Sequence, residues 1–171
     1  NQLIEAVCAA NPKTIVVLNT PGAVWMPWIE QAPAVLQAWY PGEAIGSALA
    51  AVLFGAAEPG GRLPLTFPAH EGQTLPAYDG SGRVDLSEGV FVGYRHAQRE
   101  GHTPLFPFGH GLSYTRFEFS DARVTPVSDS PDAARVRVSV RNVGPRAGSE
   151  VVQVYVGPPS AAEAPVPLPA K

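Results

Sequence analysis

The chain has few charged residues and a single cysteine, and both shortages exclude classes of protein. Charged side chains make up 16% of its 171 residues, against about 25% in an average globular protein. Its 12 basic and 15 acidic residues give a net charge of −3, without the clustered Lys and Arg that nucleic-acid binding requires. We therefore predict no nucleic-acid partner. The lone Cys8 excludes an internal disulfide, and its place in an apolar segment predicts a buried thiol.

Long hydrophobic runs and metal-ligand patterns are missing as well. No apolar run approaches the ~18 residues of a membrane span, and no secretory leader pattern opens the sequence. We predict no membrane association, and the compartment stays open. The histidines lack the spacing of a metal site, and no glycine-rich phosphate motif leads into a helix. We predict neither a metal nor a cofactor, although the hydrophobic share of 45% is large enough to build a core.

The first 55 residues predict alternating helices and strands. Apolar residues four apart indicate an amphipathic helix over residues 2–10. A short β-branched run at 14–18 has the pattern of a strand covered on both faces, and 34–39 reads as a second buried strand. A helical or turn segment is predicted at 25–29 and a further helix over 43–54. This alternation with short links predicts a layered α/β domain with a mostly parallel sheet.

The sequence changes character after this region. Gly, Pro, Ser and Asp interrupt residues 56–104, where only 62–67 and 90–94 resemble strands. So long an irregular stretch is typical of functional segments or of segments that pack against something else. Further along, residues 135–141 alternate apolar and polar side chains, as a half-exposed strand does. We predict that this strand pairs with 151–156 through an intervening turn.

An aromatic loop over residues 103–120 is the most informative segment of the chain. It contains four Phe, two Pro, two Gly and one His. The prolines hold the backbone extended, and Gly109 and Gly111 allow positive φ on either side of His110. We predict an ordered loop that leads into a strand at 117–119.

This loop, which reads PLFPFGHGLSYTRF, resembles the end of the second domain of glycoside hydrolase family 3, the β-glucosidase family. Four further blocks resemble motifs of the same family and occur in the family's order. They occupy residues 11–19, 37–43 with 53–55, 61–68 and 87–95. The number and order of these matches identify the chain as a member of that family.

The resemblance implies a two-part architecture and a parent enzyme. Residues 1–115 correspond to the family's C-terminal α/β domain, a layered α/β/α sandwich, and 116–171 to the start of a fibronectin-III-like β-sandwich. The parent would be an exo-acting retaining hydrolase of terminal β-D-glucosyl residues, with its N-terminal barrel domain as the partner of this segment. A β-xylosidase or an N-acetylglucosaminidase is the alternative within the family. A non-catalytic carbohydrate-binding or interaction domain is the alternative from another class.

Neither catalytic context of the family occurs in this sequence. The resemblance implies an Asp nucleophile in a Ser-Asp-(Trp/Tyr) context and an acid/base Glu in a Glu-Gly-x-Asp-Arg segment. Asp121 and Asp129 follow serine but precede Ala and Ser, and the Glu-Gly pairs at Glu71, Glu88 and Glu100 continue differently. We therefore expect no catalytic residue in this chain and no activity of the chain alone.

Three residues are candidates for the neighbourhood of the substrate. Tyr40 follows the strand predicted over 34–39, at the edge where open α/β sheets place their ligand crevice. Glu88 either contributes to the sugar pocket or a domain interface, or it pairs with Arg95 or is a solvated loop acid. We favour the structural role, because one carboxylate cannot complete a two-carboxylate mechanism. His110 is interpreted as a side chain that hydrogen-bonds to backbone and fixes its loop.

Overall fold

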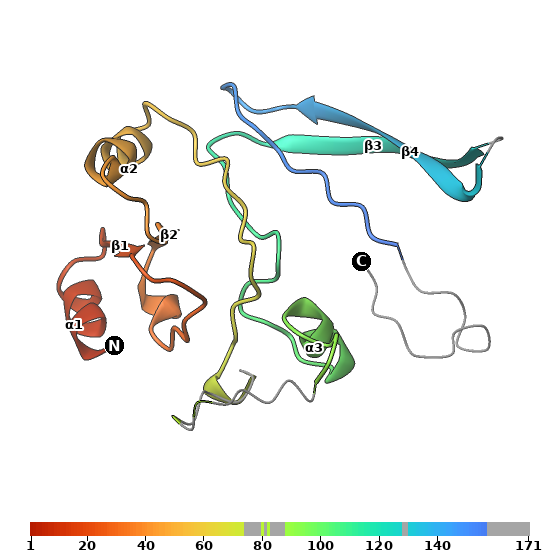
Figure 1. The fold of residues 1–171 in the computed structure, drawn as a ribbon. Coiled ribbons are helices and arrows are strands. Elements are labelled where there is room, and N and C mark those ends of the chain that lie inside the picture. Colours follow the sequence, from red (N-terminus) through yellow and green to blue (C-terminus); the bar gives the residue numbers. More distant parts are fainter. Residues whose placement is uncertain (74–79, 81, 83–87, 128–129, 157–171) are drawn as a thin grey trace. The chain divides into compact units, whose positions relative to one another are not determined.

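The computed structural model describes residues 1–73, 80, 82, 88–127 and 130–156. The chain divides into two compact units, whose elements are labelled in Figure 1. The first unit comprises Asn1–Gly46, Arg62–His110 and Gln153–Lys171, and the second comprises Ser47–Gly61 and Gly111–Val152.

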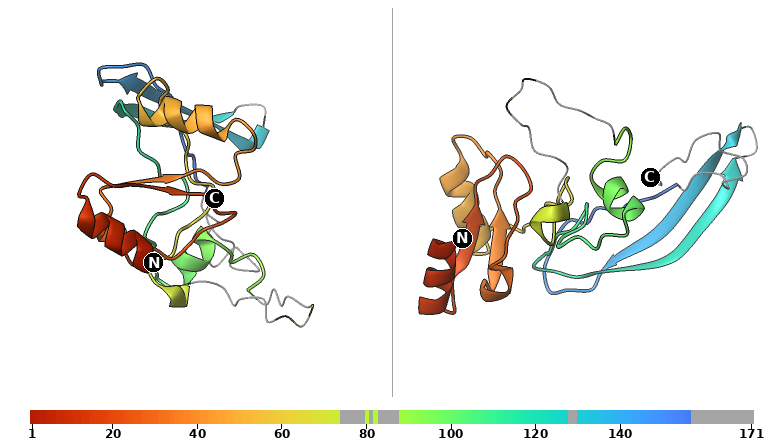
Figure 2. Two further views of the ribbon diagram at one scale, coloured as in Figure 1. Left: turned by 90° about the vertical axis from the view of Figure 1, so that its left-hand side faces the viewer. Right: turned by 90° about the horizontal axis from the view of Figure 1, so that it is seen from below.

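The first unit is built on a parallel pair of strands. β1 (Ile15–Leu18) pairs with β2 (Ala34–Gln37) in parallel over their whole length. α1 (Gln2–Ala10) precedes β1 and lies beside the pair (Figures 1 and 2), and the 3-10 helix η1 (Ile29–Gln31) precedes β2. The predicted helix, both predicted strands and the parallel pairing are confirmed.

The core of this unit lies against one face of the parallel pair. Its centre consists of the buried side chains Met26, Trp28 and Phe67. Val16 of β1 and Val35 of β2 pack against this centre. On the other face of β1, Ile15 and Val17 are 48% and 36% exposed. The sequence predicts cover on both faces of β1, but within the described residues the second face is open.

Residues 62–68 and residues 104–110 of the aromatic loop run antiparallel to each other without forming strands. The Leu63 amide donates to the His110 carbonyl at 2.8 Å, and the Gly109 amide donates to the Leu63 carbonyl at 2.7 Å. Only Phe67 and Phe106 form a β-bridge. The strand predicted over 62–67 is therefore wrong. Each segment carries two prolines, and these lack the N–H groups that a continuous ladder needs.

A short helix replaces the second strand predicted in the irregular region. A 3-10 turn, η2, covers Glu71–Gln73, and α3 covers Tyr94–Arg99. Gly93 precedes α3 with φ 59°, in the left-handed region that favours glycine. The prediction of a strand over 90–94 is wrong, because this glycine turns the chain after only a few β-branched and aromatic residues.

The second unit includes most of α2 (Ile45–Leu53), which confirms the helix predicted over 43–54. The last carbonyls of a helix have no partner within it, and two side chains bind carbonyls at this end. The Tyr114 hydroxyl donates to the Val52 carbonyl at 2.8 Å, and Arg146 Nη2 donates to the Gly55 carbonyl at 2.7 Å. The Arg146 guanidinium also lies 5.3 Å from the centroid of the Tyr114 ring, so the two side chains hold this end together.

The rest of the second unit is dominated by an antiparallel pair of long strands. β3 (Phe117–Val127) pairs with β4 (Ser130–Asn142), and a bulge interrupts the register after Ser120. Asp121 lies in this bulge with φ 53°. The strands predicted at 117–119 and 135–141 are confirmed, and both are longer than the sequence indicates.

The partner predicted for the second of these strands is wrong. Residues 151–156 form no strand, and β4 pairs with β3 instead. The connection after β4 is anchored to the segment that follows α2, since Arg146 binds the Gly55 carbonyl and the Ser149 amide donates to Glu58 Oε2 at 3.4 Å. A connection held in this way does not close the tight turn that a hairpin needs.

Three further predictions concern Cys8, membrane-spanning helices and the end of the chain. Cys8 is 6% exposed, which confirms the buried thiol. Within the described residues, no helix is both long and apolar enough to cross a membrane. Residues 157–171, which belong to the predicted second domain, lie outside the described part of the chain.

Candidate functional site

Tyr40 and its neighbour Trp39 lie at the carboxyl end of β2. Trp39 has φ 55°, a left-handed conformation that is rare for a large side chain. Its ring packs against Phe67 with 6.3 Å between centroids, and Trp39 is one of the partly buried residues that surround the core centre. Tyr40 is 70% exposed. The left-handed backbone at Trp39 thus directs the Trp39 side chain toward the core and the next side chain, Tyr40, into solvent.

The same end of the parallel pair carries a polar contact. Gln37 Nε2 donates to the carbonyl and to the hydroxyl of Thr20, at 3.2 Å and 3.1 Å. Gln37 Oε1 is buried and has no hydrogen-bond partner within the described residues. Because an unpaired buried acceptor costs about 1–3 kcal/mol, this edge favours the approach of a further hydrogen-bond donor.

Glu88 occupies a turn and is half-buried. Its carbonyl accepts a hydrogen bond from the Phe91 amide at 3.1 Å. No basic side chain of the described residues pairs with its carboxylate, and the Nε of Arg95 is buried without a partner there. The ion pair considered between Glu88 and Arg95 is therefore not formed, and the loop-acid interpretation fits what the structure describes.

His110 is held in its loop by backbone and by an aromatic ring. Its amide donates to the Pro107 carbonyl at 3.0 Å, and its own carbonyl accepts from Leu63. The imidazole stacks on Phe106, with 4.7 Å between centroids and 26° between planes. Gly109 has φ 82°, the positive φ expected of it, whereas Gly111 is not among the residues with positive φ.

Burial lowers the pKa of the His110 imidazole below its ordinary value of 6.5, and the positive charge of Arg62 lowers it further. Both causes disfavour the charged form of the ring. The neutral ring therefore predominates at neutral pH. The imidazole makes no hydrogen bond to backbone within the described residues, so the predicted side-chain bond that fixes the loop stays a prediction.

We expect stability to fall as the pH drops below about 6.5, and His110 to contribute to that fall. Between the lowered pKa and the ordinary value, the unfolded chain binds a proton that the folded chain does not, so acidification favours unfolding. Thermal unfolding of the His110→Gln variant should depend less on pH between 7 and 5 than that of the parent sequence. His70→Gln, which replaces an exposed histidine, is measured beside it as the control for the loss of one histidine. Identical pH profiles for His110→Gln and the parent sequence would contradict this assignment.

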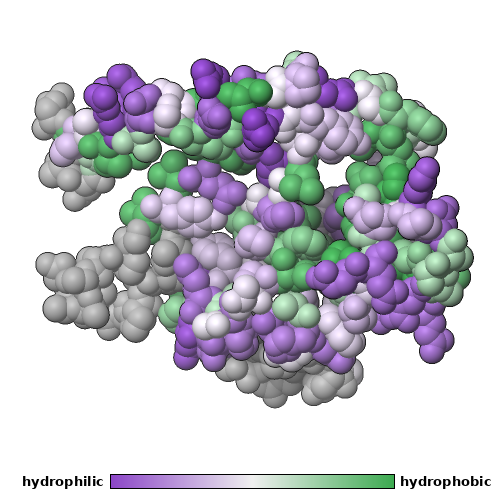
Figure 3. All heavy atoms as spheres, turned by 180° about the vertical axis from the view of Figure 1, so that it is seen from behind, coloured by the Kyte–Doolittle hydropathy of each residue, from purple (hydrophilic) through white to green (hydrophobic). Residues whose placement is uncertain are grey.

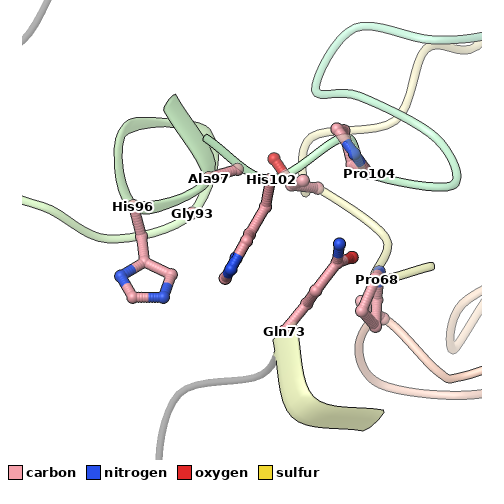
Figure 4. A pocket seen from close by; sticks show the side chains of 9 residues that line it. Pro68, Gln73, Gly93, His96, Ala97, His102 and Pro104 are labelled. Atoms are coloured by element: carbon pink, nitrogen blue, oxygen red, sulfur yellow. The ribbon is translucent and has the colours of Figure 1, made fainter. Parts of the chain in front are cut away.

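A cavity of about 210 Å³ opens beside α3 (Figure 4). His96 of α3, His102 and Gln73 point into it, and Pro68 and Pro104 contribute apolar walls. The ring of His102 lies 6.0 Å from that of His96 and 6.4 Å from that of His70. The structure therefore brings together three histidines that are far apart or irregularly spaced in the sequence.

The cavity offers unpaired hydrogen-bonding groups. Thr66 Oγ1 and His102 Nδ1 are buried there and have no partner within the described residues. Among the described residues, no carboxylate lines the cavity. No group of three His, Cys, Asp or Glu among the described residues could hold a metal ion. Glycoside hydrolysis with retention needs two carboxylates about 5–5.5 Å apart, and the described lining of this cavity does not include them.

The three candidate residues lie in separate segments. Tyr40 follows β2, Glu88 precedes α3, and His110 lies in the middle of the aromatic loop. Within the described part of the chain, no hydrogen bond, ion pair or ring contact joins any two of them. None of them lines the cavity beside α3. Within the described residues the three candidates therefore do not form a catalytic site together, and their place near a substrate stays a prediction.

Comparison with known proteins places this arrangement in a family. The family model described as the glycosyl hydrolase family 3 C-terminal domain matches residues 1–114. The chain belongs to glycosyl hydrolase family 3. The match covers the parallel pair, α2, α3 and the aromatic loop up to Tyr114.

Relatives with this segment carry the name β-glucosidase. A β-glucosidase of Rhizobium radiobacter is 48% identical over 94% of this chain and 20% of its own length. Thermostable β-glucosidase B of Acetivibrio thermocellus is 48% identical over 91% of this chain and 21% of its own length.

Solved structures agree with this grouping. DesR, a β-glucosidase from Streptomyces venezuelae in complex with D-glucose, superposes with a TM-score of 0.86 at 45% identity, over 99% of this chain and 22% of that one. A β-glucosidase from Kluyveromyces marxianus in complex with glucose gives 0.83 at 41% identity, over 98% of this chain and 20% of that one. The chain thus spans about a fifth of the length of the proteins that it matches.

Proposed function

We propose that this chain is a segment of a β-glucosidase that releases terminal β-D-glucosyl residues with retention of configuration. The observation that carries the proposal is the 48% identity to named β-glucosidases over nearly the whole chain. In the retaining reaction one carboxylate attacks the anomeric carbon and a second protonates the leaving oxygen. Both carboxylates would belong to other parts of the parent, because neither sequence context occurs here and, among the described residues, no carboxylate lines the cavity beside α3.

The proposal extends to the architecture of the parent. Residues 1–115 would complete a layered α/β/α domain with a mostly parallel sheet, and 116–171 would begin a fibronectin-III-like sandwich. The parallel pair supports the first part, and the antiparallel pair of β3 and β4 supports the second. The N-terminal barrel of the parent would cover apolar side chains that are exposed in the irregular region, such as Leu65 (41%), Val90 (51%) and Val92 (42%).

We expect the isolated 171-residue chain to be inactive and the full-length parent to be active. The assay measures release of the aryl group from an aryl β-glucoside, with the aryl β-xyloside and N-acetylglucosaminide as the arms for the alternative specificities. Glu88→Gln in the parent should leave kcat close to the unsubstituted value, because Glu88 lacks a second carboxylate with which to share the reaction. Turnover by the isolated chain that Glu88→Gln abolishes would overturn the proposal. If the parent preferred the xyloside or the N-acetylglucosaminide, the assigned activity would be that of a β-xylosidase or an N-acetylglucosaminidase instead.

Tyr40 supplies a prediction about substrate binding in the parent. We expect Tyr40→Ala to raise KM by roughly three- to tenfold, the effect of losing an aromatic contact worth about 0.5–1.5 kcal/mol. Tyr40→Phe, which keeps the ring, should retain most of the affinity if the ring stacks on a sugar. The measurement is the dependence of rate on aryl glucoside concentration. An unchanged KM for Tyr40→Ala would remove Tyr40 from the substrate neighbourhood.

A further inference from the structure

β3 and β4 form a sheet with two unlike faces. On one face the register places Val140 opposite Phe119 and Val136 opposite Val124. The space-filling view shows hydrophilic side chains on one side of this strand pair and hydrophobic ones on the other (Figure 3). In a β-sandwich the apolar face is the one that a second sheet covers, so the polar face stays in solvent.

The polar face is rich in arginine. The register places Arg141 opposite Glu118, Arg137 opposite Arg123 and Arg135 opposite Thr125. All four arginines are exposed, and they make up four of the 12 basic residues of a chain whose net charge is −3.

Only one of these arginines is neutralised within the described residues. Arg141 pairs with Glu118 at 3.0 Å. The carboxylate of Asp121, in the bulge, accepts a hydrogen bond from the Ser120 hydroxyl at 3.0 Å. Arg123 and Arg137 face each other across the strands, and like charges in that position destabilise a sheet. An anion that binds between them would remove this repulsion.

The residue types on this face narrow the choice of anion. A guanidinium binds carboxylate with two parallel hydrogen bonds. Alternate residues along a strand lie about 7 Å apart, so the arginines form a row suited to a linear polymer of anions rather than to one small ion. Ser139 and Ser120 lie opposite each other within the row and offer hydroxyls. The aromatic residues Phe117 and Phe119 belong to the opposite face, so this face has no rings on which nucleic-acid bases could stack.

We propose that this arginine face binds an acidic polysaccharide, a polymer of uronic acid residues. Its carboxylates would pair with Arg123, Arg135 and Arg137, and its hydroxyls would bind the interleaved serines. The proposal is independent of the glucosidase assignment, because the face contains no group of the proposed reaction.

The test uses the full-length parent and polygalacturonate as the probe. Binding is measured by affinity electrophoresis, and methyl-esterified polygalacturonate serves as the uncharged ligand with the same backbone. We expect binding to the acidic polymer only, weakening as NaCl is added. The Arg123→Gln/Arg137→Gln variant should bind about tenfold more weakly, since exposed ion pairs contribute about 0.2–1 kcal/mol each. Lys13→Gln/Arg99→Gln removes the same charge elsewhere and should bind as the unsubstituted protein does.

The thermal stability of the double variant and a second variant, Arg135→Gln, distinguish a loss of binding from misfolding. Because Arg123→Gln/Arg137→Gln removes a like-charge pair, its thermal unfolding midpoint should equal or exceed that of the parent in the absence of polymer. If that variant misfolds, Arg135→Gln, opposite an uncharged Thr125, should still weaken binding. Equal loss in the two double variants, equal binding to the esterified polymer, or tighter arginine-dependent binding to duplex DNA would each overturn the proposal.

Discussion

Phe67→Ala is expected to lower the free energy of unfolding by about 3–5 kcal/mol, the range for truncation of a buried phenylalanine. Phe67 is 1% exposed and lies in the buried centre with Met26 and Trp28. Its ring meets Trp39 and Phe106 edge to face, with centroids 6.3 Å and 6.5 Å away. Truncation leaves a cavity that these rings cannot fill. Urea unfolding followed by tryptophan fluorescence measures the loss.

Phe54→Ala is the matched control, because Phe54 is 87% exposed. The same truncation at a surface position should change stability by about 0.5 kcal/mol or less. Phe67→Leu keeps most of the buried volume and should cost less than about 1.5 kcal/mol. Equal losses at positions 54 and 67 would show that Phe67 does not centre the core.

Much of the first unit could be predicted from sequence because its signals are local. The period of apolar residues in Gln2–Ala10 and the β-branched run of Ile15–Leu18 each specify an element without reference to the rest of the chain. The parallel order of β1 and β2 follows from the intervening connection. The family motifs added the identity of the chain, and the family model confirms it.

The strand errors come from signals that a neighbouring residue overrides. Residues 90–94 have β-forming side chains, but Gly93 turns the backbone and α3 follows. Residues 62–67 do exchange backbone hydrogen bonds with the aromatic loop, but prolines on both sides keep the ladder from forming. In both cases a glycine or a proline decided the outcome against the propensity of its neighbours.

The pairing of β4 depends on distant contacts that no local pattern encodes. The sequence favours the nearest alternating segment, residues 151–156, as its partner. The structure pairs β4 with β3, whose length is hidden in the sequence by Pro126 near its end and by the bulge at Asp121. The anchoring of Arg146 to the Gly55 carbonyl, 91 residues away, fixes the connection differently from a hairpin turn.

The candidate site shows the same division between local and distant information. Tyr40 could be proposed from its place after a buried strand, but the left-handed Trp39 that directs it to solvent has no sequence signal. The cavity beside α3 could not be predicted, because His96 and His102 meet only through the fold of the irregular region. The sequence shows where the histidines are, but only the structure shows that the rings of His70, His96 and His102 lie close together.

Gly144→Ala is expected to destabilise the second unit by about 3 kcal/mol, the upper end of the range for overpacking. A Cβ at this position would lie 2.7 Å from the backbone nitrogen of Arg116 and 3.0 Å from Thr115 Cα, and it would also meet Thr115 Oγ1. Backbone atoms cannot move away as the end of a flexible side chain can. The added methyl would therefore break the hydrogen bond between Thr115 and Asn142, which is 2.7 Å long, and displace the Val143 amide from the Arg116 carbonyl.

Gly61→Ala in the same unit is the control for that clash. No atom lies within 4 Å of the Cβ it would add, and its φ is not positive. Because alanine restricts the unfolded chain more than glycine does, Gly61→Ala should leave stability unchanged or raise it by about 0.4–1 kcal/mol. Hydrogen exchange of the β3 and β4 amides reports on this unit directly, and faster exchange is expected in Gly144→Ala alone. Equal exchange in the two variants would mean that the backbone around Gly144 accommodates the added methyl without loss of stability. The contact between the start of β3 and the end of β4 would then contribute little to holding the strands in register.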